Sequence, residues 1–185
     1  IKVPSDLTIK NIISIFAVGK KNDIGEMVLN AHSCRIILDC SKTVNEMTHF
    51  KATQSDGVNC IINEVAKHTK RGLIGTLDIQ SMFYCFQLDR SLWSYFCVEH
   101  PEMGIFCYKR CPMGWAVSPQ SVREFMLRIL YKYKDNLRRY LDDIVFWGKD
   151  KQEFLFVLDG ILSTLAYFNF RVKGSKMKIL GTSIK

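Results

Sequence analysis

The chain lacks any long apolar run. Its longest apolar stretch, residues 12–18, is interrupted by Ser14 and is much shorter than the about 18 residues that a membrane-spanning helix needs. It also lacks a recognisable signal peptide, an internal repeat and a low-complexity linker. With 185 residues, 48% of them hydrophobic, we expect a globular protein with one domain, or with one compact domain and a smaller lobe.

Metal-binding patterns of histidine and cysteine are absent as well. The four histidines are scattered, and Cys107 and Cys111, with Cys97 and His100 nearby, match no zinc-finger spacing. The seven cysteines are odd in number and most lie within apolar runs. We therefore expect reduced thiols inside a protein of a cytosolic type of compartment.

Acidic residues are the scarcer charge, with 18 Asp and Glu against 26 Lys and Arg and a net charge of +8. An excess of this size favours a polyanionic partner, of which nucleic acid is the simplest. Charge alone does not separate a nucleic-acid-binding protein from one with an ordinary basic surface. The placement of the few acids carries more information.

Two adjacent acids, Asp142 and Asp143, stand between apolar runs at 137–141 and 144–147. A strand–turn–strand interpretation places both at the tip of a hairpin. Such a pair in a turn is ordinary by itself, but Asp78 ends another apolar run at 73–77. Three carboxylates on two adjacent strands repel one another unless a cation lies between them, and they suit Mg²⁺, which prefers oxygen ligands.

The apolar spacing predicts an α+β fold, with helices on one face of a sheet and the acids on the open face. One helix is expected over 58–68, a second starts with Ser118 as N-cap and Pro119 in the first turn, and a third follows Asp150, capped with Glu153. Strands are expected at 12–18, 27–29 (in a hairpin with 35–38), 73–79, 83–88, 93–98, 104–108, 170–172 and 177–180.

Several motifs, taken in order, resemble the reverse transcriptases of LTR retrotransposons and retroviruses. The matching residues are Asp78 with Phe83 five positions later; Pro112, Met113, Gly114 and Trp115 with Ser118 and Pro119; and Tyr140, Leu141, Asp142 and Asp143. Residues 15–21 and 35–39 resemble two strands of the fingers, with Asn45 one residue later than its counterpart. Lys176 resembles a lysine late in the palm.

The resemblance implies the fingers and palm of a right-hand polymerase, whose palm is a ferredoxin-like antiparallel sheet. It assigns residues 1–53 and 89–111 to the fingers, and 54–88 and 112–185 to the palm. The chain begins with Ile1 and ends where the family continues into a thumb. We therefore expect an excerpt of a longer protein, without the thumb.

The resemblance also implies a role for each matching residue. Asp78, Asp142 and Asp143 would be catalytic and, with the main chain of Ile79, would bind two Mg²⁺ ions, for which Mn²⁺ could substitute. Phe83 would stack under the sugar and exclude a 2′-hydroxyl. The residues expected to bind the nucleotide are Lys20, Arg35, Ser81, Met82, Phe83, Met113 and Gly114. Those expected to contact template and primer are Trp115, Ser118, Pro119, Tyr140, Leu141 and Lys176.

The implied function is RNA-directed DNA synthesis with deoxynucleoside triphosphates on an RNA or DNA template–primer. Further expected partners are the other Pol domains and a second subunit, in a cytoplasmic virus-like particle or virion, with the nucleus as an alternative. Two other hypotheses remain open. The chain could be a truncated or domesticated module that binds nucleic acid or a partner without catalysis, or a related palm polymerase that makes RNA.

Overall fold

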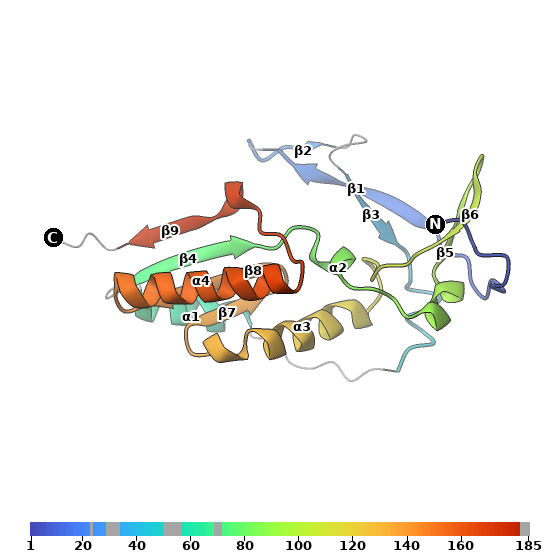
Figure 1. Ribbon diagram of the computed structural model, residues 1–185. Coiled ribbons are helices and arrows are strands. Elements are labelled where there is room, and N and C mark those ends of the chain that lie inside the picture. The colour runs from blue at the N-terminus through green and yellow to red at the C-terminus, as the bar shows by residue number, and fades with distance from the viewer. Residues whose placement is uncertain (23, 29–33, 50–56, 69–71, 182–185) are drawn as a thin grey trace. The chain divides into compact units, whose positions relative to one another are not determined.

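The computed structural model describes residues 1–22, 24–28, 34–49, 57–68 and 72–181 (Figure 1). The chain divides into two compact units, each assembled from two separate stretches. Unit 1 comprises Ile1–Lys51 and Phe83–Pro119, and unit 2 comprises Ala52–Met82 and Gln120–Lys185. The assignment of fingers and palm segments, with boundaries at 53/54, 88/89 and 111/112, stays a prediction, and the first boundary lies outside the described residues.

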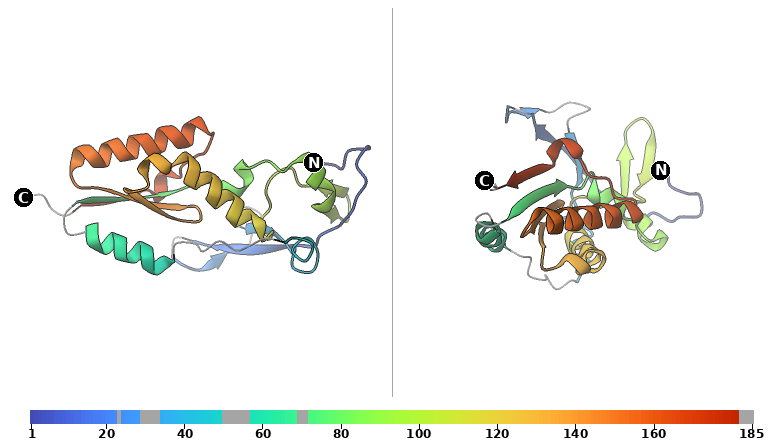
Figure 2. Two further views of the ribbon diagram at one scale, coloured as in Figure 1. Left: turned by 90° about the horizontal axis from the view of Figure 1, so that it is seen from below. Right: turned by 60° about the vertical axis from the view of Figure 1, so that its left-hand side comes forward.

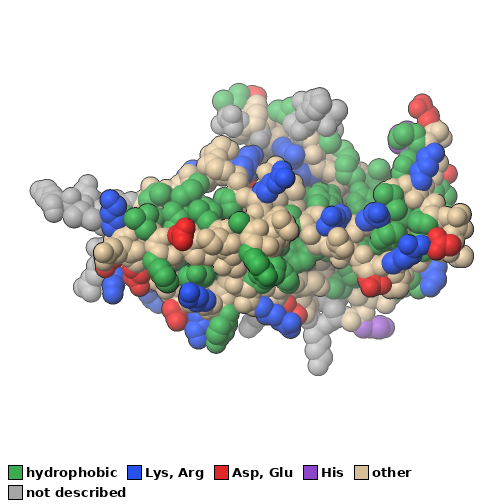
Figure 3. Space-filling view, in the orientation of Figure 1, with side chains coloured by type: hydrophobic (Ala, Val, Ile, Leu, Met, Phe, Trp, Pro, Cys, Tyr) green, Lys and Arg blue, Asp and Glu red, His purple; other side chains and the backbone are tan. Residues whose placement is uncertain are grey.

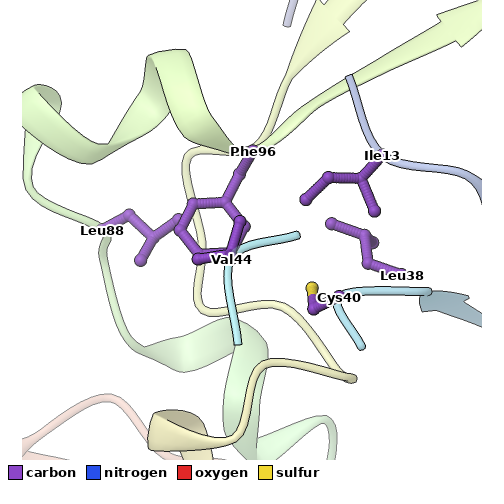
Figure 4. Packing of buried hydrophobic residues seen from close by; sticks show 6 residues of the cluster. All are labelled: Ile13, Leu38, Cys40, Val44, Leu88 and Phe96. Carbon is purple, nitrogen blue, oxygen red and sulfur yellow. The ribbon is translucent and has the colours of Figure 1, made fainter. Parts of the chain in front are cut away.

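Unit 1 contains two antiparallel sheets. The first has strand order β2-β1-β3, formed by β1 (Ile15–Lys21), β2 (Met27–Val28) and β3 (Cys34–Leu38). The second pairs β5 (Cys97–His100) with β6 (Gly104–Cys107). The buried residues of one apolar cluster fill the space between these elements: Ile13, Leu38, Cys40, Val44, Leu88 and Phe96 (Figure 4).

The predicted hairpin of 27–29 with 35–38 is wrong for the described residues, because β1 lies between β2 and β3 and pairs with both. A tight turn after β1 explains this. The Asn22 side-chain oxygen accepts hydrogen bonds from the backbone N–H groups of Ile24 and Glu26, at 3.1 and 2.9 Å. An Asx turn of this kind brings β2 back onto β1.

Two further predicted strands are also wrong. Residues 83–88 overlap the short helix α2 (Met82–Cys85), and 93–98 overlap the 3₁₀ helix η1 (Arg90–Tyr95), so that β5 starts only at Cys97. The Asp89 carboxylate starts η1 by accepting a hydrogen bond from the Ser91 N–H at 2.9 Å. Apolar alternation alone did not reveal this cap.

Unit 2 is built on a four-stranded antiparallel sheet with strand order β7-β8-β4-β9. Its strands are β4 (Leu73–Asp78), β7 (Leu137–Tyr140), β8 (Asp143–Gly148) and β9 (Lys178–Gly181). Its helical elements are α1 (Val58–His68), α4 (Lys151–Tyr167) and the 3₁₀ helices η2 (Tyr131–Tyr133) and η3 (Gly174–Lys176). Helix α3 (Val117–Ile129) begins in unit 1 and continues into unit 2. In place of the predicted strand at 170–172, the structure has a single bridge between Ile79 and Val172.

Helices cover both faces of this sheet, although unequally (Figure 2). On β8, Phe146 stacks on Phe154 of α4 at 5.0 Å, while the next residue, Trp147, stacks on His68 of α1 at 4.5 Å. Successive strand residues point to opposite faces, so α4 and α1 lie on opposite sides. The predicted α+β class is confirmed, but α1 departs from the predicted one-sided packing because it covers the Trp147 end of the second face.

The ends of α4 follow from its sequence. Asp150 caps the first turn by accepting the Glu153 N–H at 2.8 Å, as predicted, and Glu153 accepts the Lys149 N–H at 2.7 Å. The helix ends with Asn169 at φ +59°, and the Phe170 N–H donates back to the Leu165 carbonyl at 2.8 Å. This left-handed termination turns the chain toward the end of β4.

Ser118 is not the N-cap of α3, which begins one residue earlier. Its side chain is buried, and its hydroxyl donates to the Pro112 carbonyl at 2.9 Å and accepts from the Cys111 thiol at 3.0 Å. Ser118 therefore ties the first turn of the helix to the loop before it. Among the described residues, no helix has the length and apolar character needed to cross a bilayer.

Candidate active site

Asp78 and Asp143 lie directly opposite each other in the antiparallel ladder of β4 and β8. Directly opposed residues point to the same face, with β-carbons about 5 Å apart. The adjacent pair, Leu77 and Ile144, points to the other face and is buried. The apolar pair anchors both strand ends beneath α4, and this leaves the two carboxylates on the opposite face.

The third acid, Asp142, occupies the two-residue turn between Tyr140 and Asp143. Its backbone carbonyl accepts a hydrogen bond from the Ile79 N–H at 3.0 Å. Leu141, the other residue of the turn, has φ +53°, a left-handed conformation that a tight hairpin needs but that usually selects glycine. Tyr140 and Leu141 are each 45% exposed, so the tip presents two apolar side chains beside the acids.

The segment that follows α4 holds the end of β4 from its other side. The Lys173 N–H donates to the Asp78 carbonyl at 2.9 Å, and the Gln80 N–H donates to the Arg171 carbonyl at 2.8 Å. Beyond these bonds, the Lys176 ammonium lies 2.5 Å from the Asp78 carboxylate. Asp78 therefore has backbone contacts on both sides and a cation at its side chain.

The charges of this cluster act on one another. Loss of water around Asp143, followed by the negative charges of Asp142 and Asp78, raises the pKa of the Asp143 carboxyl, while Lys176 opposes the rise. The hydrogen bond to Asp78 is the main cause that raises the pKa of Lys176. Three acids around one lysine leave an excess of negative charge, which favours a further cation.

The donor set fits Mg²⁺ by its chemistry, because carboxylate and backbone carbonyl oxygens are the ligands that this ion takes. The side chains are not arranged as a finished site. Among the described residues, no three His, Cys, Asp or Glu side chains are grouped so that they could hold a metal ion. The ladder brings the backbones of the acids together, and side-chain rotation, including displacement of Lys176 from Asp78, would still be needed to form a metal site.

Lys20 and Arg35, expected to bind the triphosphate, lie on one face of the β2-β1-β3 sheet in unit 1. Arg35 pairs with Val18, and Lys20 lies two residues further along β1, so both side chains point to the side that Val18 faces. Both residues are exposed. The structure brings these two cations together as neighbours on one sheet surface.

The loop at 113–115 borders the end of β3. The Leu38 N–H donates to the Met113 carbonyl at 3.0 Å. Gly114 has φ +108°, and a β-carbon there would lie 2.0 Å from the Leu38 carbonyl oxygen. The Trp115 ring meets Phe96 edge to face at 5.0 Å. Only glycine fits this close approach of two backbones, and Trp115 is anchored in the apolar cluster of unit 1.

The remaining predicted residues lie around α2 and the start of α3. Ser81 has φ +52° and turns the chain from β4 into the helix. Met82 is buried at 2% exposure, whereas Phe83 is half-buried. Pro119 is exposed in the first turn of α3.

Sequence reasoning missed two features of the site. The backbone bonds from 171–173 to the end of β4 leave no sequence signal, because any residue supplies them. The sequence sets Asn45 apart only by its position, yet its side chain makes two hydrogen bonds to the loop that contains Gly114. The loop of Gly114 lies beside the end of β3, and Asn45 follows that strand by a few residues. An asparagine at such a position is a signal that could have indicated this contact.

Comparison with known proteins identifies relatives of this chain. The model of the family described as reverse transcriptase (RNA-dependent DNA polymerase) matches residues 20–185. Over 76 residues, 41% of this chain, the sequence is 33% identical to a putative enzymatic polyprotein of cassava vein mosaic virus, of which the match covers 12%.

Solved structures of a foamy viral protein have the same fold. The native protease–reverse transcriptase of prototype foamy virus is 21% identical, with a TM-score of 0.73 over 94% of this chain and 22% of that one. A foamy viral protease–reverse transcriptase in complex with double-stranded DNA is 19% identical, with a TM-score of 0.76 over 94% of this chain and 28% of that one. A complex with an RNA/DNA hybrid is 18% identical, with a TM-score of 0.74 over 95% and 22% of the two chains. The chain therefore spans well under a third of these relatives.

Proposed function

This chain belongs to the reverse transcriptase (RNA-dependent DNA polymerase) family, and from this premise we propose that it carries the catalytic acids of template-directed DNA synthesis. The single observation that supports the proposal most is the pairing of Asp78 with Asp143, with Asp142 in the turn beside them. Three acids this close to one another, with a single lysine among them, repel one another unless a further cation is bound. The proposed reaction is attack of a primer 3′-hydroxyl on the α-phosphate of a deoxynucleoside triphosphate, with release of pyrophosphate.

In this proposal Asp78, Asp142 and Asp143, with the carbonyl of Ile79, hold two divalent ions. When bound, Mg²⁺, or Mn²⁺ in its place, supplies Lewis-acid stabilisation for an in-line phosphoryl displacement. The bond from Ile79 to Asp142 joins the ends of β4 and β8, and the bond from Lys173 to Asp78 holds the end of β4 from its other side. Lys176 steadies the Asp78 carboxylate when no metal is bound.

Residues of unit 1 would bind the nucleotide. Lys20 and Arg35 offer neighbouring cations to the triphosphate, and Met113 and Gly114 offer a half-buried side chain and an exposed backbone to the base and sugar. Phe83 would stack under the sugar and reject a 2′-hydroxyl, so Phe83→Ala should increase ribonucleotide incorporation relative to deoxynucleotide incorporation.

The chain's charge supports a nucleic-acid partner. Its net charge is +8, and Lys and Arg side chains are spread among apolar ones over the face in Figure 3. Two of the foamy viral structures are complexes with double-stranded DNA and with an RNA/DNA hybrid. We propose an RNA or DNA template–primer as the partner, with the remaining Pol domains and a second subunit as further partners.

The test is primer extension on an RNA template in Mg²⁺, with the parent protein and Asp142→Asn compared at equal concentration. The proposal expects extension by the parent and loss of at least about a hundredfold in the variant, as is usual when a key electrostatic group is removed. Equal extension by both would reject the assigned acids. Template–primer binding without any incorporation would favour the non-catalytic alternative.

A further inference from the structure

We infer that Asn45 is a positioning residue for deoxynucleotide binding, which rests on the function proposed above. Its side-chain amide makes a pair of hydrogen bonds to one loop. The nitrogen Nδ2 donates to the Gly114 carbonyl at 3.1 Å, and the oxygen Oδ1 accepts from the Ala116 N–H at 2.8 Å. One amide thus fixes the two peptide groups on either side of Trp115.

Asn45 is itself held rigidly. Its backbone N–H donates to the Cys40 carbonyl at 3.0 Å, and the Thr48 hydroxyl donates to the Val44 carbonyl at 2.5 Å. Cys40 and Val44 are both buried in the apolar cluster of unit 1, as Figure 4 shows. Because the backbone around Asn45 is anchored in this cluster, the Asn45 side chain holds the loop at a fixed position relative to the core.

The loop needs such support because of Gly114. A glycine at φ +108° has more freedom to rotate its peptide than any other residue. The bond from Asn45 to the Gly114 carbonyl fixes the orientation of that peptide. The Thr48 hydroxyl adds a third contact, since it accepts from the Trp115 indole N–H at 3.4 Å.

The same loop is tied to the strand that carries Arg35. Leu38, the last residue of β3, donates to the Met113 carbonyl at 3.0 Å. The bonds from Leu38 and Asn45 together hold Met113 and Gly114 at a set distance from Arg35, all within unit 1. Displacement by about 1 Å is enough to weaken a binding or catalytic arrangement severely. Asn45 therefore acts on the nucleotide through the loop, without touching it.

The isosteric variant Asn45→Asp tests this role in the complete protein. It keeps an oxygen that accepts from the Ala116 N–H, but it replaces the amide nitrogen that donates to the Gly114 carbonyl. A carboxylate oxygen then faces that carbonyl oxygen. We expect the KM for deoxynucleotide to rise about tenfold, the loss of one good hydrogen bond, with a smaller change in the Kd for template–primer because the Trp115 ring stays packed on Phe96. Asn11→Asp is the matched control, because Asn11 Nδ2 also donates to a carbonyl of unit 1, that of Tyr95 at 3.3 Å, and this variant should keep the parent KM.

A second readout does not depend on activity. The Ala116 amide should be protected from hydrogen exchange in the parent and in Asn45→Asp, and should exchange at least about tenfold faster in Asn45→Ala, which lacks the acceptor. If Asn45→Asp does not fold, Thr48→Val weakens the same loop through Trp115 and should also raise the deoxynucleotide KM.

The outcomes separate this inference from the function on which it rests. If the parent synthesises DNA and Asn45→Asp keeps the parent KM, Asn45 has no positioning role, and the proposed function stands. Equal changes in deoxynucleotide KM, template–primer Kd and melting temperature would indicate a general structural role and would also reject the inference. If the parent makes no DNA in any test, the proposed function fails and this inference fails with it.

Discussion

Lys176 and Asp78 form an ion pair in which the acid is the better buried partner: the Asp78 side chain is 11% exposed and that of Lys176 is 52% exposed, with 2.5 Å between Nζ and Oδ2. Removing the cation leaves a nearly buried carboxylate alone. We expect Lys176→Met to lower the free energy of unfolding by about 1 kcal/mol in metal-free buffer, a value reduced for the exposure of the lysine.

Urea unfolding measures this effect, with Lys67→Met as control. Lys67 pairs with Glu64 at 2.8 Å on an exposed helix surface, where its own side chain is 67% exposed. That variant should lower the free energy of unfolding by clearly less than Lys176→Met does. Equal costs for both variants would show that the burial of Asp78 is of no consequence.

Asp143 should reduce the stability of the metal-free protein at neutral pH. Loss of water and the neighbouring acids raise its pKa in the folded state, so the folded state binds the proton more tightly than the unfolded state. Stability is therefore lost as pH rises from the ordinary aspartate range through the raised pKa. Asp143→Asn should unfold at a higher temperature than the parent at pH 7, and this difference should vanish in acid.

Thermal unfolding between pH 4 and 7.5 measures this difference. Asp159→Asn on the exposed surface of α4 is the charge control and should unfold at about the parent temperature at pH 7. A parent more stable than Asp143→Asn at pH 7 without metal would contradict the assigned electrostatics.

Leu141 should be strained by its left-handed backbone. At φ +53° a β-branched side chain fits worse than leucine, whereas glycine fits without strain. We expect Leu141→Gly to exceed Leu141→Val in unfolding free energy by about 1–2 kcal/mol. Urea titration measures the order, and equal stability of the two variants would mean that the turn relaxes easily.

Gly75 should not tolerate a side chain. A β-carbon there would lie 2.2 Å from the Phe146 ring, which is fully buried. Gly75→Ala should cost about 1–3 kcal/mol by overpacking, whereas Gly174→Ala, which meets no atom within 4 Å, should be near neutral. Adding Phe146→Leu should recover part of the Gly75→Ala loss in a double-mutant cycle; additive costs would exclude the contact.

Cysteine reactivity should follow burial. Cys60 is exposed, whereas Cys40, Cys97, Cys107 and Cys111 are buried. Loss of water raises the pKa of Cys40 to about 11 and also raises the pKa of Cys97 and Cys111. A thiol-specific reagent at pH 7.5 should modify Cys60 first and the buried thiols only on unfolding, as read by mass spectrometry. Rapid modification of Cys40 in folded protein would contradict this packing.

Local patterns in the sequence were sufficient for the features that depend on a few neighbouring residues. The acid hairpin, the strand that ends at Asp78 and the cap formed by Asp150 and Glu153 each follow from spacing that one segment carries by itself. These are interactions between residues close in sequence. The apolar runs predicted buried thiols, and four cysteines are buried, but Cys60 is exposed and Cys34 and Cys85 are only partly buried.

Features that depend on distant partners could not be predicted. The position of α1 on the second face of the sheet depends on the stack of His68 with Trp147, far apart in the sequence. The pairing of β2 with β1 is local, but it depends on the hydrogen bonds of the Asn22 side chain, which apolar spacing does not reveal. Ser118 had the residue type of an N-cap but bonds to Pro112 instead. Alternating apolar residues at 83–88 are equally compatible with a short helix.

Binding of Mn²⁺, followed by electron paramagnetic resonance, tests most directly whether Asp78, Asp142 and Asp143 form a divalent-cation site. The parent should bind Mn²⁺, and Asp142→Asn should bind it at least about tenfold more weakly, since one charged oxygen ligand is lost, while Asp159→Asn should match the parent. Equal Mn²⁺ affinity in the parent and Asp142→Asn would contradict the account.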